Sequence, residues 1–177
     1  MRTEYLLDRE IDMILAALTY QNALIMRVCL HTGLRIGDVL ELKPGQIGPH
    51  FWVTEQKTGK RRQVGLPEPL LTAVRNHAGH FWCFPSPVDN RKHVTRQAVW
   101  KDVKRAARAF RLPQNVAPHS MRKVYAVDLM RKYGNINKVA RALNHSSASI
   151  TVLYAMADQL LEAKQIRQRP GAGRRRV

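Results

Sequence analysis

Hydrophobic residues recur at three- and four-residue spacings near the start of the chain, which is typical of a helix packed against a core. This pattern predicts a first helix that Asp8 caps and that runs to about Tyr20. The almost wholly apolar stretch 23–31 predicts a buried second helix, and Gly33 is placed to end it in a left-handed cap. A short third helix is expected to begin at Arg35.

The pattern then changes to one that is typical of strands. Segments 51–54 and 63–66 have strand composition and flank the polar turn Lys57-Thr58-Gly59-Lys60. We therefore predict a β-hairpin with a basic tip.

Helical spacing returns after this hairpin. Pro67 permits a helix over about 68–77, and the stretch 79–90 is expected to be a loop with one short strand at most. Further helices are predicted over 95–110, from Pro118 to Gly134, over 136–143, from 146 or 147 to 154, and over 158–168. The predicted fold class is α+β, a mostly helical domain over 1–169 with one small antiparallel sheet, followed by a basic, disordered tail over 170–177.

The net charge of the chain indicates what kind of partner it binds. The 177 residues carry 30 Lys and Arg against 13 Asp and Glu, a formal net charge of +17, while 45% hydrophobic residues suffice for a folded core. Such a polycation favours a polyanionic partner, because each neutralised phosphate releases counterions. We expect this partner to be nucleic acid rather than a membrane surface. No apolar run suggests a signal peptide or a membrane span, so we expect the protein to reside in the cytoplasm and to associate with the nucleoid.

Two cysteines far apart, Cys29 and Cys83, argue against a disulfide framework and a thiolate zinc site. The spacing His77-x-x-His80-x-x-Cys83 has ligand-like residue types, but Gly79 and Pro85 spoil a rigid helical frame. We predict no metal and no cofactor.

Four ordered motifs carry the chemistry. They are Thr32-Gly33-Leu34-Arg35 with Asp38, the hairpin from Gln56 to Pro67, Pro118-His119-Ser120-Met121-Arg122, and Leu143-Asn144-His145-Ser146-Ser147 leading to Tyr154. In this order they resemble the motifs of the tyrosine recombinases, the phage-integrase family. Asn144 stands where glycine is usual in that family. The resemblance covers essentially the whole chain, and it implies an enzyme of bacterial or phage origin that cleaves double-stranded DNA.

The resemblance also implies a role for each motif residue. Arg35 and Arg122 neutralise the non-bridging oxygens of the scissile phosphate, a task suited to the planar guanidinium donor fork. Tyr154 is the nucleophile that forms a 3′-phosphotyrosine link and frees a 5′ hydroxyl. Because an unperturbed phenol has a pKa of about 10, it needs help near neutrality. His119 is placed to manage its proton, and His145 to hydrogen-bond the phosphate.

Three assignments are less determined by the motifs. Lys57 is the candidate general acid for the 5′ oxygen, with Lys60 as a rival because hairpin registers slip. Asp38 is expected to support the site by pairing with Arg35 or by steadying the neighbouring turn. Lys60, Arg61 and Arg62 are expected to bind DNA.

Several functions stay open at this stage. The leading one is the catalytic domain of an integrase or site-specific recombinase that acts as a tetramer on DNA, with helix 158–168 docked on its own core or on a neighbouring protomer. The alternatives are a non-catalytic DNA-binding module of the same fold and a type IB topoisomerase-like relaxing activity. The first predicted helix begins almost at Met1, where the family commonly carries an amino-terminal DNA-gripping domain. The chain is therefore expected to be a fragment or a minimal form.

Overall fold

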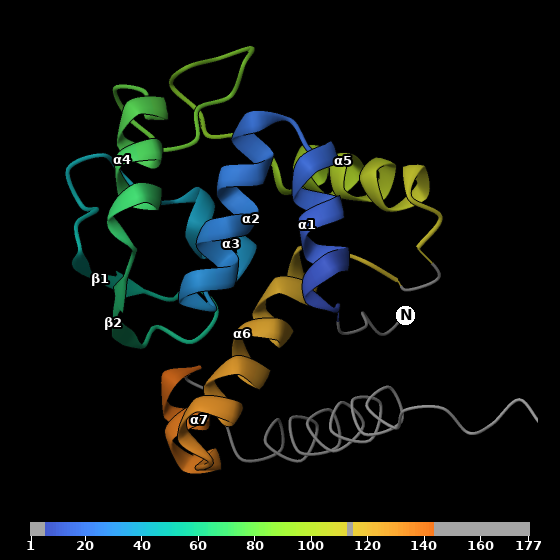
Figure 1. Ribbon diagram of the computed structural model, residues 1–177. Helices are drawn as coiled ribbons and strands as arrows, with labels where there is room; N and C mark the ends of the chain where they lie inside the picture. The colour runs from blue at the N-terminus through green and yellow to red at the C-terminus, as the bar shows by residue number, and fades with distance from the viewer. Residues whose placement is uncertain (1–5, 113–114, 144–177) are drawn as a thin grey trace, which may run out of the picture.

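The computed structural model describes residues 6–112 and 115–143, and Figure 1 shows their arrangement. The elements are α1 (Asp8–Ala17), α2 (Tyr20–Thr32), α3 (Ile36–Leu40), β1 (His50–Thr54), β2 (Arg61–Gly65), α4 (Glu68–His77), α5 (Arg96–Ala109), α6 (Pro118–Tyr133) and α7 (Ile136–Ala142). This mostly helical fold with one antiparallel pair of strands confirms the predicted class. The predicted helices over 146–154 and 158–168 and the tail over 170–177 lie outside the described residues.

Helix α2 lies at the centre of the molecule. It contacts α1, α3, α4 and α6, and its residues Ile25, Met26 and Val28 are fully buried. Its unusually apolar sequence follows from this position, because neighbouring helices cover most of its surface and leave only a narrow side with Arg27 and His31 exposed. Gly33 ends α2 with a φ of 63°, and its N–H donates to the carbonyl of Cys29, which is the predicted left-handed cap.

Helix α1 is shorter than predicted. It ends at Ala17 rather than near Tyr20, because Leu18 and Thr19 are extended and α2 begins directly afterwards. The break is stabilised by α5, where Asp102 accepts hydrogen bonds of 3.0 Å from the backbone N–H and from the hydroxyl of Thr19. Asp8 is the first helical residue rather than the cap, and Glu10 accepts from the backbone N–H of Leu7.

The hairpin forms with its strands close to the predicted ones. His50 pairs with Gly65 and Thr54 with Arg61, so the connecting turn is 55–60. One face of the sheet is buried and the other is exposed, as the period of two requires. The predicted short strand beyond α4 is a single antiparallel bridge between Pro85 and His93.

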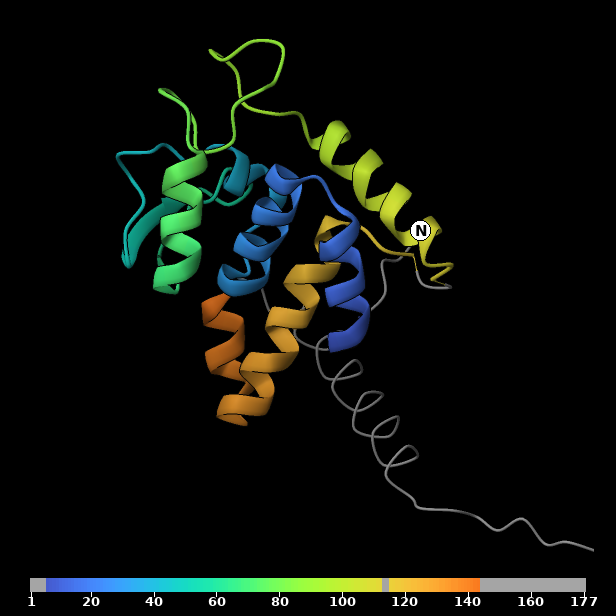
Figure 2. The same ribbon diagram turned by 45° about the horizontal axis from the view of Figure 1, so that its top comes forward.

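Helices α6 and α7 lie side by side at one end of the molecule in both views (Figures 1 and 2). Pro118 opens α6 and Gly134 ends it with a φ of 57°, both as predicted. Thr95 caps α5 by accepting from the N–H of Ala98. Within the described part of the chain, no helix is both long and apolar enough to span a bilayer.

Candidate active site

Arg35 lies directly before α3, and hydrogen bonds of Thr32 fix the turn that leads to it. The hydroxyl of Thr32 donates to the carbonyl of Val28 at 2.6 Å and accepts from the N–H of Leu34 at 3.2 Å. Arg35 itself is the residue before the first helical one and is extended. Its side chain is 25% exposed, so the guanidinium can reach both the interior and a ligand in solvent.

Arg122 projects from the first turns of α6 into the same region. Its Nη1 donates to the carbonyl of Gly33 at 2.5 Å, and its Nη2 donates to the carbonyl of Leu143 at 2.6 Å. These bonds fix the guanidinium between the end of α2 and the end of α7. Burial, followed by the nearby charge of Arg35, lowers the pKa of Arg122 to about 10, so the group stays charged at neutral pH.

Lys57 lies in the turn of the hairpin. This turn is closed by the backbone of Glu55, whose N–H donates to Lys60 at 3.0 Å and whose carbonyl accepts from Gly59 at 2.8 Å. Gly59 has a φ of 65°, which glycine adopts without strain.

A cavity of about 450 Å³ brings these motifs together. Its wall includes Arg35, Lys57, His119 and Arg122, which are four of the six predicted catalytic residues. The remaining lining residues are Leu34, Ile36, Gly37, Asp38, Gln56, Arg96 and Pro118. The four cations on this wall, Arg35, Lys57, Arg96 and Arg122, suit an anionic group such as a phosphodiester.

His119 is held in its neutral form at this cavity. It occupies the first turn of α6, where Ser120 Oγ accepts from the N–H of Ala117. Burial lowers the pKa of His119 below its ordinary value, and the charges of Lys123, Arg122, Arg35 and Lys57 lower it further. A neutral imidazole at pH 7 can accept a proton, which a general base must do.

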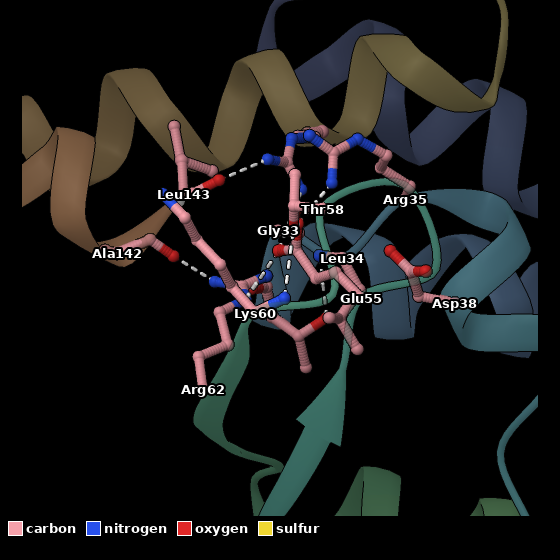
Figure 3. A network of polar contacts seen from close by, with 12 residues as sticks. Gly33, Leu34, Arg35, Asp38, Glu55, Thr58, Lys60, Arg62, Ala142 and Leu143 are labelled. Atoms are coloured by element: carbon pink, nitrogen blue, oxygen red, sulfur yellow. Dashed lines mark hydrogen bonds and ion pairs between the residues drawn. The ribbon is translucent and has the colours of Figure 1, made fainter. Parts of the chain in front are cut away.

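Asp38 stabilises the hairpin rather than Arg35. Its Oδ1 accepts a 3.0 Å hydrogen bond from the backbone N–H of Gln56, and the residue is 3% exposed. Of the two expected roles, the contacts support the second, the steadying of a neighbouring turn. Arg35 instead pairs with the carboxylate of Glu55 (Figure 3).

Glu55 and Arg62 were not predicted as parts of the site interior. Glu55 is fully buried, and Arg62 lies beneath the site with its Nε 3.1 Å from Glu55 Oε1. The alternation of side chains along the strand does indicate that Glu55 points inward, because Glu55 continues the buried series of Phe51 and Val53. Glu55 is not among the predicted site residues, so this inward placement was missed.

The three cations expected to bind DNA differ in placement. Lys60 and Arg61 are exposed, and Arg61 lies over the ring of Trp52 at 5.3 Å. Arg62 is 8% exposed and donates to the carbonyls of Thr32 and Ala142, so its guanidinium faces the interior rather than the surface where a DNA contact was expected. Arg96, at the start of α5, is a further cation on the cavity wall, and its Nη2 donates to Gln56 at 3.2 Å.

Two predicted catalytic residues, His145 and Tyr154, lie outside the described residues, and so does the segment 158–168. Two residues of the ligand-like spacing at 77–83 have other surroundings. His77 hydrogen-bonds to Gln21 at 2.7 Å, and Cys83 is buried in the hydrophobic core. Within 6–112 and 115–143, no group of three or more His, Cys, Asp or Glu side chains could hold a metal ion.

The sequence of this chain is similar to known recombinases. The model of the Phage integrase family matches residues 4–160. The relative named "Probable integrase/recombinase YoeC" of Bacillus subtilis strain 168 is 32% identical over 136 residues, which are 73% of this chain and 74% of that protein. The chain spans only 43% to 58% of the length of seven further curated relatives.

Solved structures share the fold. The XerA recombinase superposes with a TM-score of 0.73 at 20% identity, over 94% of this chain and 64% of that one. A lambda integrase tetramer bound to a Holliday junction gives a TM-score of 0.70 at 21% identity, over 86% of this chain and 48% of that one. With the family model matched over 157 of 177 residues (4 to 160 inclusive), and with the motif arginines gathered at one cavity, the chain belongs to the phage integrase family.

Proposed function

We propose that this chain is the catalytic domain of a site-specific recombinase or integrase that cleaves and rejoins DNA through a covalent 3′-phosphotyrosine. The observation that carries this proposal is the cavity at which Arg35, Lys57, His119 and Arg122 meet. They come from three separate parts of the chain, and each supplies a group that phosphodiester cleavage requires.

The reaction balances with these groups alone. Tyr154 Oη loses its proton to neutral His119 and attacks the phosphorus, while Arg35 and Arg122 stabilise the charge on the non-bridging oxygens. The bond from phosphorus to the 5′ oxygen breaks, and Lys57 gives that oxygen a proton. His145 donates a hydrogen bond to the phosphate. Attack by a 5′ hydroxyl reverses each step and rejoins the strand, so no cofactor is consumed.

Assembly is part of this proposal. Strand exchange between two duplexes needs four cleaving subunits, and a lambda integrase of similar fold is known as a tetramer on a Holliday junction. We propose the same stoichiometry for this chain on DNA, with segment 158–168 docking on a neighbouring protomer. Deletion from Asp158 onward should then impair tetramer assembly on DNA. The net charge of +17 supports residence on the nucleoid.

Covalent capture tests the proposal against a non-catalytic DNA-binding module. A pool of nicked duplexes, from which the cleaved strand end diffuses away, is incubated with the protein and EDTA and then run on denaturing gels. The wild type should give a denaturant-resistant adduct and Tyr154→Phe should give none. DNA retention without an adduct in both proteins would favour the binding module. Relaxation of supercoiled DNA without partner exchange would favour the topoisomerase-like alternative.

A further inference from the structure

We propose that Glu55 is a positioning residue that aligns the two phosphate-binding arginines with the lysine turn, and that Arg62 is its buried counter-ion. This inference deepens the proposed function and rests on it. Neither residue lines the cavity that holds the candidate catalytic groups. Glu55 directly follows β1 and pairs with Arg35 of the cavity wall, and Arg62 lies on β2 beside Glu55 (Figure 3).

One carboxylate contacts three guanidinium groups. Glu55 Oε2 pairs with Arg35 Nη1, while Glu55 Oε1 lies 3.1 Å from Arg62 Nε and 3.9 Å from Arg122 Nη1. The Glu55 side chain is fully buried. A buried carboxylate is strongly destabilising unless cations and hydrogen bonds compensate it, so its orientation and theirs are fixed together.

The same residue builds the turn that carries Lys57. The carbonyl of Glu55 accepts from the N–H groups of Thr58 and Gly59, and its carboxylate accepts from the hydroxyl of Thr58 at 3.3 Å. Lys57 therefore lies inside the loop that these bonds close, between Glu55 and Thr58. Displacing the Glu55 side chain would shift both Arg35 and the turn of the candidate general acid.

Arg62 connects this centre to two other motif segments. Its Nη2 donates to the carbonyl of Thr32 at 2.9 Å, directly before Gly33, and its Nη1 donates to the carbonyl of Ala142. Ala142 precedes Leu143, whose carbonyl accepts from Arg122. The pair of Glu55 and Arg62 thus reaches the segments that present Arg35, Lys57 and the chain leading to His145.

The electrostatics give this role a specific signature. The Glu55 charge reduces the repulsion among three neighbouring guanidinium groups, and it also reduces their attraction for a phosphate. Replacing it with glutamine removes the charge and turns amide hydrogens toward the arginine donors. Such a variant should bind DNA as tightly as the wild type or more tightly, and yet it should cleave more slowly because Arg35 and Lys57 are misaligned.

The experiment compares Glu55→Gln with Asp102→Asn in the full chain. Both substitutions remove one negative charge, and Asp102 is a mostly buried carboxylate that bonds Thr19, Asn22 and Arg105 rather than the site. Three quantities are measured: duplex affinity, the rate of adduct formation at saturating nicked duplex, and thermal stability. We expect Glu55→Gln to slow adduct formation about tenfold or more with no loss of affinity. Asp102→Asn should retain the wild-type rate.

An activity-independent measurement separates this inference from the proposed function. The Nε–Hε NMR signals of Arg35 and Arg62, assigned with Arg35→Lys and Arg62→Lys, are recorded without DNA. Glu55→Gln should shift both signals and Asp102→Asn neither. Unshifted signals overturn the positioning role, and so does wild-type cleavage by Glu55→Gln. If even the wild type forms no adduct, the catalytic function fails, and the arginine signals alone decide whether Glu55 positions them.

Discussion

The carboxylate of Asp38 accepts a 3.0 Å hydrogen bond from the backbone N–H of Gln56, the residue directly before Lys57. Asp38 belongs to α3, which Arg35 directly precedes, so this partly buried contact connects the segment that carries Arg35 to the turn that carries Lys57. The relative placement of a phosphate-binding cation and a proton donor therefore depends on a residue that itself need not touch DNA.

Asp38→Ala should separate these two groups. The N–H of Gln56 would lose a partly buried hydrogen bond, at a cost of about 0.5–1.5 kcal/mol in the free energy of unfolding. Asp38→Asn is the matched control, because its amide oxygen can still accept the bond. We expect adduct formation to fall about tenfold or more with alanine and much less with asparagine. Denaturant unfolding and capture of nicked duplex measure the two effects, and equal losses in both variants would contradict the assignment.

Gly33→Ala should be far more harmful than Gly134→Ala. Both glycines end helices with positive φ, 63° and 57°, so alanine adds a similar backbone strain of about 1–2 kcal/mol at each. A Cβ at Gly33 would also overlap the ring of Tyr125, whereas among the described residues nothing lies within 4 Å of a Cβ at Gly134. The carbonyl of Gly33 holds Arg122, so only Gly33→Ala should slow cleavage as well. Similar melting temperatures for the two variants would refute this argument.

Features set by local sequence were predictable. Gly33, Thr95, Pro118 and Gly134 act through the backbone of their own turns, and the structure places helix boundaries at each. The inner ion-pair cluster was not predictable in the same way. Glu55, Arg62 and Arg122 meet only when the hairpin, α2, α6 and the end of α7 pack together. A charged residue in an inward strand position was the one local sign of it.

The lowered pKa of His119 predicts how DNA cleavage depends on pH. Because burial and four neighbouring cations lower its pKa below the ordinary 6.5, its neutral form persists somewhat below that pH. Adduct formation should therefore decline only as pH falls through the lowered pKa. Between the lowered pKa of His119 and 6.5, the unfolded chain binds this proton more readily than the folded chain does. The contribution of His119 to the free energy of unfolding is therefore fully present above pH 6.5 and is lost as pH falls through the lowered pKa.

The measurement is the pH dependence of capture, with His119→Gln beside the wild type. His77→Gln is the control, since burial also lowers the pKa of His77, but its ring bonds Gln21 away from the cavity. His77→Gln should keep the acid decline and His119→Gln should abolish it along with most of the activity. An unaltered decline in His119→Gln would assign the titration to another group.

Both cysteines should be unreactive in the folded protein. Burial raises the pKa of Cys29 and of Cys83 to about 12, and both residues are fully buried. Thiolates are the reactive form, so a thiol-specific disulfide reagent should modify them only as the protein unfolds. Modification is followed at increasing denaturant concentration beside circular dichroism. Fast reaction at zero denaturant would contradict the burial of these side chains.

The choice between Lys57 and Lys60 as general acid can be decided by the leaving group. Lys57 lies on the cavity wall beside Arg35, whereas Lys60 is exposed and pairs through its backbone with Glu55. Cleavage of an ordinary phosphodiester expels an alkoxide that needs a proton. A substrate with sulfur in place of the bridging 5′ oxygen expels a thiolate, which is stable near neutrality because thiols have pKa values of about 8.5.

Lys57→Ala should therefore cleave the oxygen substrate slowly, by a factor of about 100 or more, and the sulfur substrate at nearly the wild-type rate. Lys60→Ala should cleave both substrates equally well and lose only salt-dependent affinity, as Arg61→Ala should too, since both side chains are exposed. Single-turnover rates at saturating DNA separate the two effects. The opposite result would be that the sulfur substrate restores cleavage by Lys60→Ala while Lys57→Ala cleaves both substrates at the wild-type rate. Lys60 would then be the general acid. The turn would also have to rearrange on DNA, because Lys57 and not Lys60 lines the cavity.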